Sequence, residues 1–356
     1  MTFLLRPFAV LLLVLLGGCA GPLYYAQAVQ GEIEILAKRR PIGEVLADPA
    51  TPPATKRRLE LVQRLREFAG RELRLPADRS YRTYADLERP YAVWNVFATP
   101  ALSLKPKKWC FVVAGCVPYR GYFKLAAAEK FAAELKQEGD DVYVGGVPAY
   151  STLGWFSDPV LNTFIDRPEA DLAGLLFHEL AHQELYVSGD TAFNESFATA
   201  VQLEGVKRWF QQNGDAQVAD QYLEKMKRRD EFIRLVLRHR AHLAEVYASD
   251  SSDADKRAAK AREFEALRHD YTLLKMKWNG YAAFDGWFAG DLNNARLAAI
   301  NLYSQYLAAF QELLRQQHGD FAAFYRAVEK IARLPKKERD STLSSLEQRA
   351  TQADAG

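Results

Sequence analysis

Two histidines four residues apart mark the stretch of this sequence that is best suited to chemistry. Residues 178–182 read His-Glu-Leu-Ala-His, and positions i and i+4 of an α-helix lie on the same face. His178 and His182 can therefore present two imidazoles to one metal ion, and Glu179 can act as a general base on a water molecule at that ion. Apolar residues recur around them at helical spacing: Leu172, Leu175, Leu176, Leu180 and Leu185. The pattern predicts a buried active-site helix.

A third metal ligand is expected, because a catalytic zinc ion usually has three protein ligands and one open position. Glu195 is the best candidate, since it lies about one turn into a second helical pattern. The short connection contains Gly189, which suits the C′ position of the first helix, and Asp190 or Thr191, which suit the N-cap of the second. Such a turn folds the second helix against the first. We therefore predict one Zn²⁺ ion per chain, held by the histidine pair and Glu195.

The other four histidines show no comparable pattern. His239 and His242 lie in a Lys- and Arg-rich helical run, and we expect their side chains to be solvated, while His269 lies in another charged helix. His318 precedes a glycine and is expected to end a helix.

The two motifs together resemble a known class of zinc peptidases. The His-Glu-Leu-Ala-His stretch followed by Asn-Glu-Ser-Phe-Ala at 194–198 is similar to the gluzincin metallopeptidases, whose third ligand lies in an N-E-x-x-A stretch. The linker between His182 and Glu195 is shorter than in the best-known gluzincins. The resemblance implies that His178, His182 and Glu195 bind zinc.

A wider resemblance covers nearly the whole chain after its N-terminal segment. The chain is similar to a bacterial family of predicted aminopeptidases in these stretches: 89–100, 109–123, 141–164, 178–198 and 293–310. Aminopeptidase activity is what this resemblance implies. The spacing of the metal motif does not itself show which end of a peptide would be cut.

The elements around the site indicate an α+β fold. Runs rich in β-branched and aromatic residues predict strands at 93–98, 109–113 and 142–144, and a helical pattern occupies 126–137. Further helices are predicted at these ranges: 56–68, 191–210, 216–247, 254–278 and 293–310. Taken with the resemblance, this implies a zincin-like small sheet with active-site helices and a largely helical C-terminal half.

We divide the chain into consecutive ranges on this basis. They are a lipoprotein signal peptide (1–18), a lipidated cysteine with tether and N-terminal helix (19–55), a zincin-like catalytic body (56–213), a helical C-terminal part (214–340) and a charged tail (341–356), which is expected to fray.

The glycine-rich stretch after the third predicted strand is a candidate substrate-binding segment. Zinc peptidases bind the substrate main chain along a sheet edge beside the active-site helix, and Pro148 suits an edge strand. The predicted substrate-binding residues are Ala149, Tyr150, Ser151, Thr152 and Gly154. The alternative is a loop that packs Trp155 and Phe156 into the core.

A later stretch rich in aromatic and amide side chains, residues 279–303, offers further candidates for catalytic and substrate-binding residues. Gluzincins usually use a Tyr or His from this part of the chain to stabilise the oxyanion, which implies a catalytic role for Tyr303, with Tyr281 as second choice. Asn294 is a candidate for binding substrate backbone. Alternatively, Asn293 and Asn294 cap the helix that follows.

The N-terminus predicts export. Arg6 precedes an apolar core that is too short to span a membrane as a mature helix. Leu16-Gly17-Gly18-Cys19 follows and resembles a bacterial lipobox, which implies cleavage before Cys19 and its lipidation. The expected location is the periplasmic face of the outer membrane, held by a lipid anchor. An ordinary secretory signal with an incidental cysteine is the alternative.

Composition narrows the class of protein. The 356 residues include 47 Lys and Arg against 45 Asp and Glu, a net charge of +2, which gives no electrostatic case for a nucleic-acid partner.

Export permits a disulfide between Cys110 and Cys116, but a strand through residues 111–113 would hold them apart unless the chain turns sharply at Ala114-Gly115. The sequence leaves this bridge open.

These observations predict zinc-dependent hydrolysis of a peptide substrate, most simply by an aminopeptidase. Water activated by the metal attacks the carbonyl, and Glu179 transfers the proton to the leaving amine. Two alternatives stay open, namely a zinc-bound envelope binding or assembly factor without peptidase activity, and an endopeptidase or amidase that uses the same site. The presence of Glu179 favours an enzyme, because a structural zinc site needs no general base.

Overall fold

The computed structural model describes residues 21–111, 115–149, 157–300 and 305–354. Their contacts divide the chain into two units, each assembled from three separate segments. Unit 1 comprises the described parts of 1–38, 89–149 and 228–301, and unit 2 those of 39–88, 150–227 and 302–356. The units therefore do not follow the consecutive ranges suggested by the sequence.

Unit 1 contains an antiparallel sheet with the strand order β6-β3-β7. Its strands are β3 (Val93–Pro100), β6 (Arg120–Tyr122) and β7 (Asp140–Val147). Two of the predicted strands, at 93–98 and 142–144, are thus confirmed within longer strands. The predicted helix at 126–137 is also confirmed, as α5 (Leu125–Gln137), and the chain reverses after it at Gly139, whose φ is +89°.

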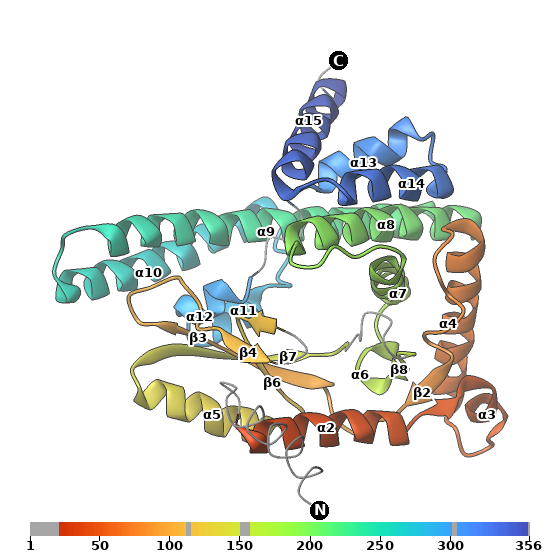
Figure 1. Cartoon of the computed structure of the whole chain (residues 1–356), viewed down its shortest axis with the longest axis horizontal. Coiled ribbons are helices and arrows are strands. Elements are labelled where there is room, and N and C mark those ends of the chain that lie inside the picture. The colour runs from red at the N-terminus through yellow and green to blue at the C-terminus, as the bar shows by residue number, and fades with distance from the viewer. Residues whose placement is uncertain (1–20, 112–114, 150–156, 301–304, 355–356) are drawn as a thin grey trace, which may run out of the picture. The chain divides into compact units, whose positions relative to one another are not determined.

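The two faces of this sheet are covered by different helices. Val96 and Ala98 share one face, because side chains alternate along a strand, and both belong to a buried cluster with Ala128 and Ala132 of α5. On the other face, the guanidinium of Arg296 in α12 (Asn294–Ala298) lies 4.9 Å from the ring centre of Tyr143. Figure 1 shows the sheet between α5 and α12.

A disulfide closes the small hairpin of unit 1. Strands β4 (Trp109–Phe111) and β5 (Gly115–Val117) pair antiparallel with Cys110 directly opposite Cys116, and the two sulfurs are bonded. The bridge that the sequence left open is therefore present. Tyr24 of α2 (Pro22–Ala37) stacks on Phe111 beside it.

The remainder of unit 1 is helical. Helix α9 (Ala216–Ala248) begins in unit 2 and continues through unit 1, where α10 (Asp253–Lys277) follows it after a short turn. Ser252 caps α10 by accepting from the backbone N–H of Asp255. These two helices and α11 (Asp285–Ala289) enclose an aromatic core that includes Phe232, Tyr271 and Phe288.

Unit 2 consists of a second small sheet and a larger set of helices. The sheet has the order β1-β2-β8, with β1 (Arg40–Pro41) antiparallel and β8 (Val160–Leu161) parallel to β2 (Thr83–Ala85). The helices are α3 (Ile42–Ala47), α4 (Pro53–Glu72), α6 (Asn162–Ile165), α7 (Glu169–Glu184), α8 (Thr191–Gln212), the start of α9, α13 (Leu307–Gln316), α14 (Phe321–Ala332) and α15 (Lys336–Asp354). Helices and small separate sheets together confirm the α+β class.

Two sequence-based expectations about the C-terminal part were wrong. The single helix predicted from 293 to 310 is two helices, because α12 ends at Ala298 and α13 begins at Leu307. The expected fraying tail forms α15, in which Leu343 and Leu346 are buried. Within the described residues, no helix combines the length and apolar character needed to cross a membrane.

Candidate metal centre

Helix α7 carries the His-Glu-x-x-His motif in the interior of unit 2. Its first turn contains Glu169 and Asp171, which interact favourably with the positive end of the helix dipole. Most of its length is apolar and buried, including Leu172, Leu176 and Leu180, each with no exposed surface. The predicted buried helix is therefore confirmed, and tight packing fixes the rotation of the helix about its axis.

Helix α8 packs along α7 in the opposite direction. The indole Nε1 of Trp209, late in α8, donates to Glu169 Oε1 at the start of α7 at 2.8 Å. Gly205 lets the helices approach closely, since a Cβ there would lie 2.7 Å from Cδ2 of Phe177. This arrangement brings Glu195, early in α8, to the late part of α7 where the histidines lie.

The turn between the helices is held by side chains next to Glu195. The amide of Asn194 accepts from the N–H of Val187 and donates to its carbonyl, both at 2.8 Å. Asp190 is the N-cap of α8 and accepts from the N–H of Phe193. Gly189, with φ of +77°, lies within this turn. It is not the C′ residue of α7 as predicted, because that helix already ends at Glu184.

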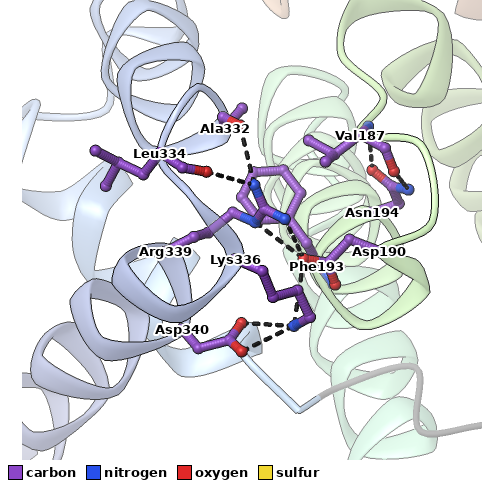
Figure 2. A network of polar contacts seen from close by, with 9 residues as sticks. All are labelled: Val187, Asp190, Phe193, Asn194, Ala332, Leu334, Lys336, Arg339 and Asp340. Atoms are coloured by element: carbon purple, nitrogen blue, oxygen red, sulfur yellow. Dashed lines mark hydrogen bonds and ion pairs between the residues drawn. The ribbon is translucent and has the colours of Figure 1, made fainter.

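An arginine from α15 fixes this turn from outside the hairpin (Figure 2). The Nε and Nη2 atoms of Arg339 lie 2.9 and 2.8 Å from Asp190 Oδ2, and both side chains are over 90% buried. Arg339 Nη1 donates to the carbonyls of Ala332 and Leu334. The guanidinium also faces the ring of Phe193 at 5.6 Å. The first turn of α8 is thereby connected to a segment far along the chain.

The three predicted ligands converge. His178 Nε2 lies 3.1 Å from His182 Nε2 and 3.3 Å from Glu195 Oε2, and His182 Nε2 lies 3.6 Å from Glu195 Oε1. Tetrahedral zinc with bonds of about 2.0–2.1 Å separates its ligand atoms by about 3.3 Å. The donor atoms therefore fit a zinc ion, and the two-His-one-Glu chemistry suits it.

A glutamine that the sequence analysis missed orients the first histidine. Gln202 Oε1 lies 2.9 Å from His178 Nδ1, and its Nε2 donates to the hydroxyl of Tyr222 at 2.6 Å. An acceptor at Nδ1 keeps the proton there and leaves the Nε2 lone pair for a metal. Gly174 makes room for this contact, because a Cβ there would lie 2.1 Å from the Tyr222 hydroxyl.

The electrostatic surroundings of the two histidines differ. Burial and the neighbouring His178 lower the pKa of His182 to about 4, so this imidazole is neutral at pH 7 and can bind a metal. Its Nδ1 is buried without a hydrogen-bond partner among the described residues. Burial also lowers the pKa of His178, but the hydrogen bond to Glu195 and the charges of Glu179 and Glu195 outweigh it and raise the pKa overall.

Glu179 is half-buried on α7 beside the histidines. Burial, together with the charges of Glu179 and Asp158, raises the pKa of Tyr81 well above its ordinary value. The phenol of Tyr81 therefore stays protonated at neutral pH.

Comparison with known families gives one match. The sequence model of the family described as "Putative aminopeptidase" matches residues 23–343, a range that includes the three candidate metal ligands and Arg339. The chain belongs to this family. No curated protein and no solved structure matches it significantly.

Of the remaining predicted site residues, Ala149, Tyr281 and Asn294 belong to unit 1, and the others lie outside the described residues. Ala149 is in unit 1, just after β7. Tyr281, the second choice for the oxyanion, packs against the aromatic core of unit 1. The following lie outside the described residues: Cys19, Tyr150, Ser151, Thr152, Gly154 and Tyr303.

The side chain of Asn294 is used within unit 1, and the capping alternative holds for Asn293 alone. Asn294 has no exposed surface. Its amide donates to the carbonyls of Ala101 and Ser103 and accepts from the hydroxyl of Tyr247, so the side chain is used within unit 1. Asn293 caps α12 by accepting from the N–H of Arg296.

Replacing Gln202 with leucine is expected to weaken zinc binding in this aminopeptidase-family protein by about 10–100-fold, because His178 would lose the acceptor that fixes its tautomer. Competition with a chelator of known affinity measures the change. Gln202→Glu is the matched control, since a carboxylate still accepts from Nδ1 and should retain tight binding. Equal zinc affinity of Gln202→Leu and wild type would contradict this role.

Proposed function

We propose that the protein is a zinc-dependent aminopeptidase whose metal is held by His178, His182 and Glu195. The observation that carries the proposal is the convergence of their donor atoms: the two Nε2 atoms lie 3.1 Å apart, and each lies 3.3 or 3.6 Å from a carboxylate oxygen of Glu195. Structural zinc sites usually have four protein ligands, whereas catalytic sites have three and an open position. Three donors with the carboxylate of Glu179 beside them therefore favour a catalytic site over a structural one.

The residues divide the chemistry between them. Zinc, when bound, supplies a Lewis acid that polarises a carbonyl and lowers the pKa of water. Glu179 takes the proton of the attacking water as the hydroxyl adds to the carbonyl carbon, and then delivers it to the amine that leaves. Gln202 and Asn194 keep the ligands in place, the first through His178 and the second through the turn before Glu195.

The choice of an exopeptidase rests on the family to which the chain belongs. We expect the purified protein to remove single residues from peptides with a free N-terminus and to leave N-acetylated copies intact. Mass spectrometry of both peptide sets, with and without prior removal of metal by a chelator, measures this. Zinc added back should restore cleavage.

Two outcomes of that experiment would contradict the proposal in different ways. Internal cleavage of both peptide sets would keep the zinc peptidase and reject the aminopeptidase. Cleavage that persists after complete metal removal would reject the zinc mechanism.

We further propose that the enzyme acts at the periplasmic face of a bacterial outer membrane, anchored through lipid on Cys19. Leu16-Gly17-Gly18-Cys19 after an apolar segment supports this, and so does the Cys110–Cys116 disulfide, which suits an oxidising compartment. Metabolic labelling with a fatty acid tests the anchor. A Cys19→Ser protein that is still labelled would contradict it.

A further inference from the structure

A second cluster of metal-binding side chains lies in the α9–α10 hairpin of unit 1. His239 and His242 belong to α9, and Glu263 and Asp270 belong to α10. One potential ligand atom each from His239, His242 and Glu263 lies within 4.8 Å of the others. The expectation that these histidines are solvated is wrong for His239, which is only 5% exposed.

His239 occupies a position in α9 where an apolar residue would be expected. It continues a buried row formed by Phe232, Val236 and Leu243, which are 4%, 0% and 0% exposed, at the spacing of one helix face. A polar ring buried there is costly unless its nitrogens have partners. The side chains around it must therefore account for both nitrogens.

Both ring nitrogens of His239 face carboxylates. Nδ1 lies 2.6 Å from Glu263 Oε1, and Nε2 lies 3.2 Å from Asp270 Oδ2. A neutral imidazole has one N–H and one lone pair, so one of these contacts would set a lone pair against a lone pair. A cation at that nitrogen removes the conflict, and it can be a proton or a metal ion.

The second histidine favours the metal ion. His242 Nδ1 lies 3.1 Å from the same Glu263 Oε1, so two imidazole nitrogens converge on one carboxylate oxygen. In the tautomer with the proton on Nε2, His239 donates to Asp270 and keeps Nδ1 for the shared centre. A carboxylate behind a ligating histidine is the usual arrangement that orients such a ligand.

We propose that His239, His242 and Glu263 bind a second divalent ion of the zinc class, with Asp270 orienting His239. Two imidazoles and one carboxylate suit zinc or a similar transition metal rather than calcium or magnesium, which prefer oxygen ligands. The side chains of His242 and Asp270 are 61% and 44% exposed, which gives the ion a route from solvent. The ion connects α9 to α10 and stabilises the hairpin.

Zinc titration of the full-length protein can isolate this site. In a His178→Ala/His182→Ala background the first centre is disabled, and we expect one zinc ion per chain to remain bound. Adding His242→Ala should abolish that binding. Adding Asp270→Asn should weaken it by about 10–100-fold, because the orienting carboxylate is lost. Calorimetry and metal analysis measure both changes.

The design includes a matched control and a safeguard against misfolding. His269→Ala removes an exposed histidine from the same helix α10, outside the cluster, and should leave zinc binding unchanged. His242 is itself exposed, so its removal should leave the circular dichroism spectrum unaltered. A background protein that binds no zinc, or one whose binding survives His242→Ala, would overturn the second site.

Discussion

Glu179→Gln is expected to lower the turnover of peptide substrates by about 10²–10⁴-fold, the usual contribution of a positioned acid–base group. Glutamine has nearly the same shape but cannot accept the proton of the attacking water. The three ligands are unchanged, so the variant should still bind one zinc ion at His178, His182 and Glu195. Single-turnover rates and metal content, measured on the same preparation, test both parts.

Glu184→Gln is a suitable control for this substitution. It makes the same chemical change at an exposed position of the same helix α7, and it should leave turnover unchanged. A Glu179→Gln protein with wild-type rates would refute the mechanism. A Glu179→Gln protein that lacks zinc would show instead that Glu179 is needed for the metal centre.

Arg339→Met is expected to lower the free energy of unfolding by about 3–5 kcal/mol, because it leaves the charge of Asp190 buried without its main partner. For a protein of this size the melting temperature should fall by roughly 4–7 °C. Asp190 caps the helix that carries Glu195, so zinc affinity should fall as well. Thermal unfolding and zinc titration measure the two effects.

Lys336→Met provides the comparison. Lys336 Nζ lies 3.5 Å from the same Asp190 oxygen, but its side chain is 56% exposed. Removing such a pair changes stability by about 0–1 kcal/mol. If Arg339→Met melted at the same temperature as Lys336→Met, the buried ion pair would have no special role. The double variant Asp190→Asn/Arg339→Met should recover part of the loss, since it removes both charges.

Local patterns in the sequence were sufficient to predict that the three candidate metal ligands come together. The helix with His178 and His182 follows from apolar periodicity, and Glu195 follows from the short turn that reverses the chain. Gln202 could have been found in the same way. It lies seven residues after Glu195, two turns along the same face of α8, and therefore also faces α7.

Features that depend on distant segments could not be read from the sequence. Arg339 contacts Asp190 across 149 residues, and in the sequence it is one charge in the run Lys336-Lys337-Glu338-Arg339-Asp340. His239 stands in a Lys- and Arg-rich run, so its place in the apolar row of α9 was obscured. The interleaved segments of the two units have no local signature, because they are defined only by contacts in the folded chain.

The position of Arg339 has a consequence for the order in which the enzyme matures. Chain synthesis reaches His178, His182 and Glu195 long before it reaches α15. Until then Asp190 lacks its arginine, and the turn before Glu195 lacks the contacts with α15 that are drawn in Figure 2. A nascent or truncated chain thus contains all three candidate ligands but lacks the arginine that pairs with Asp190, so we expect tight metal uptake to be deferred until the chain is nearly complete.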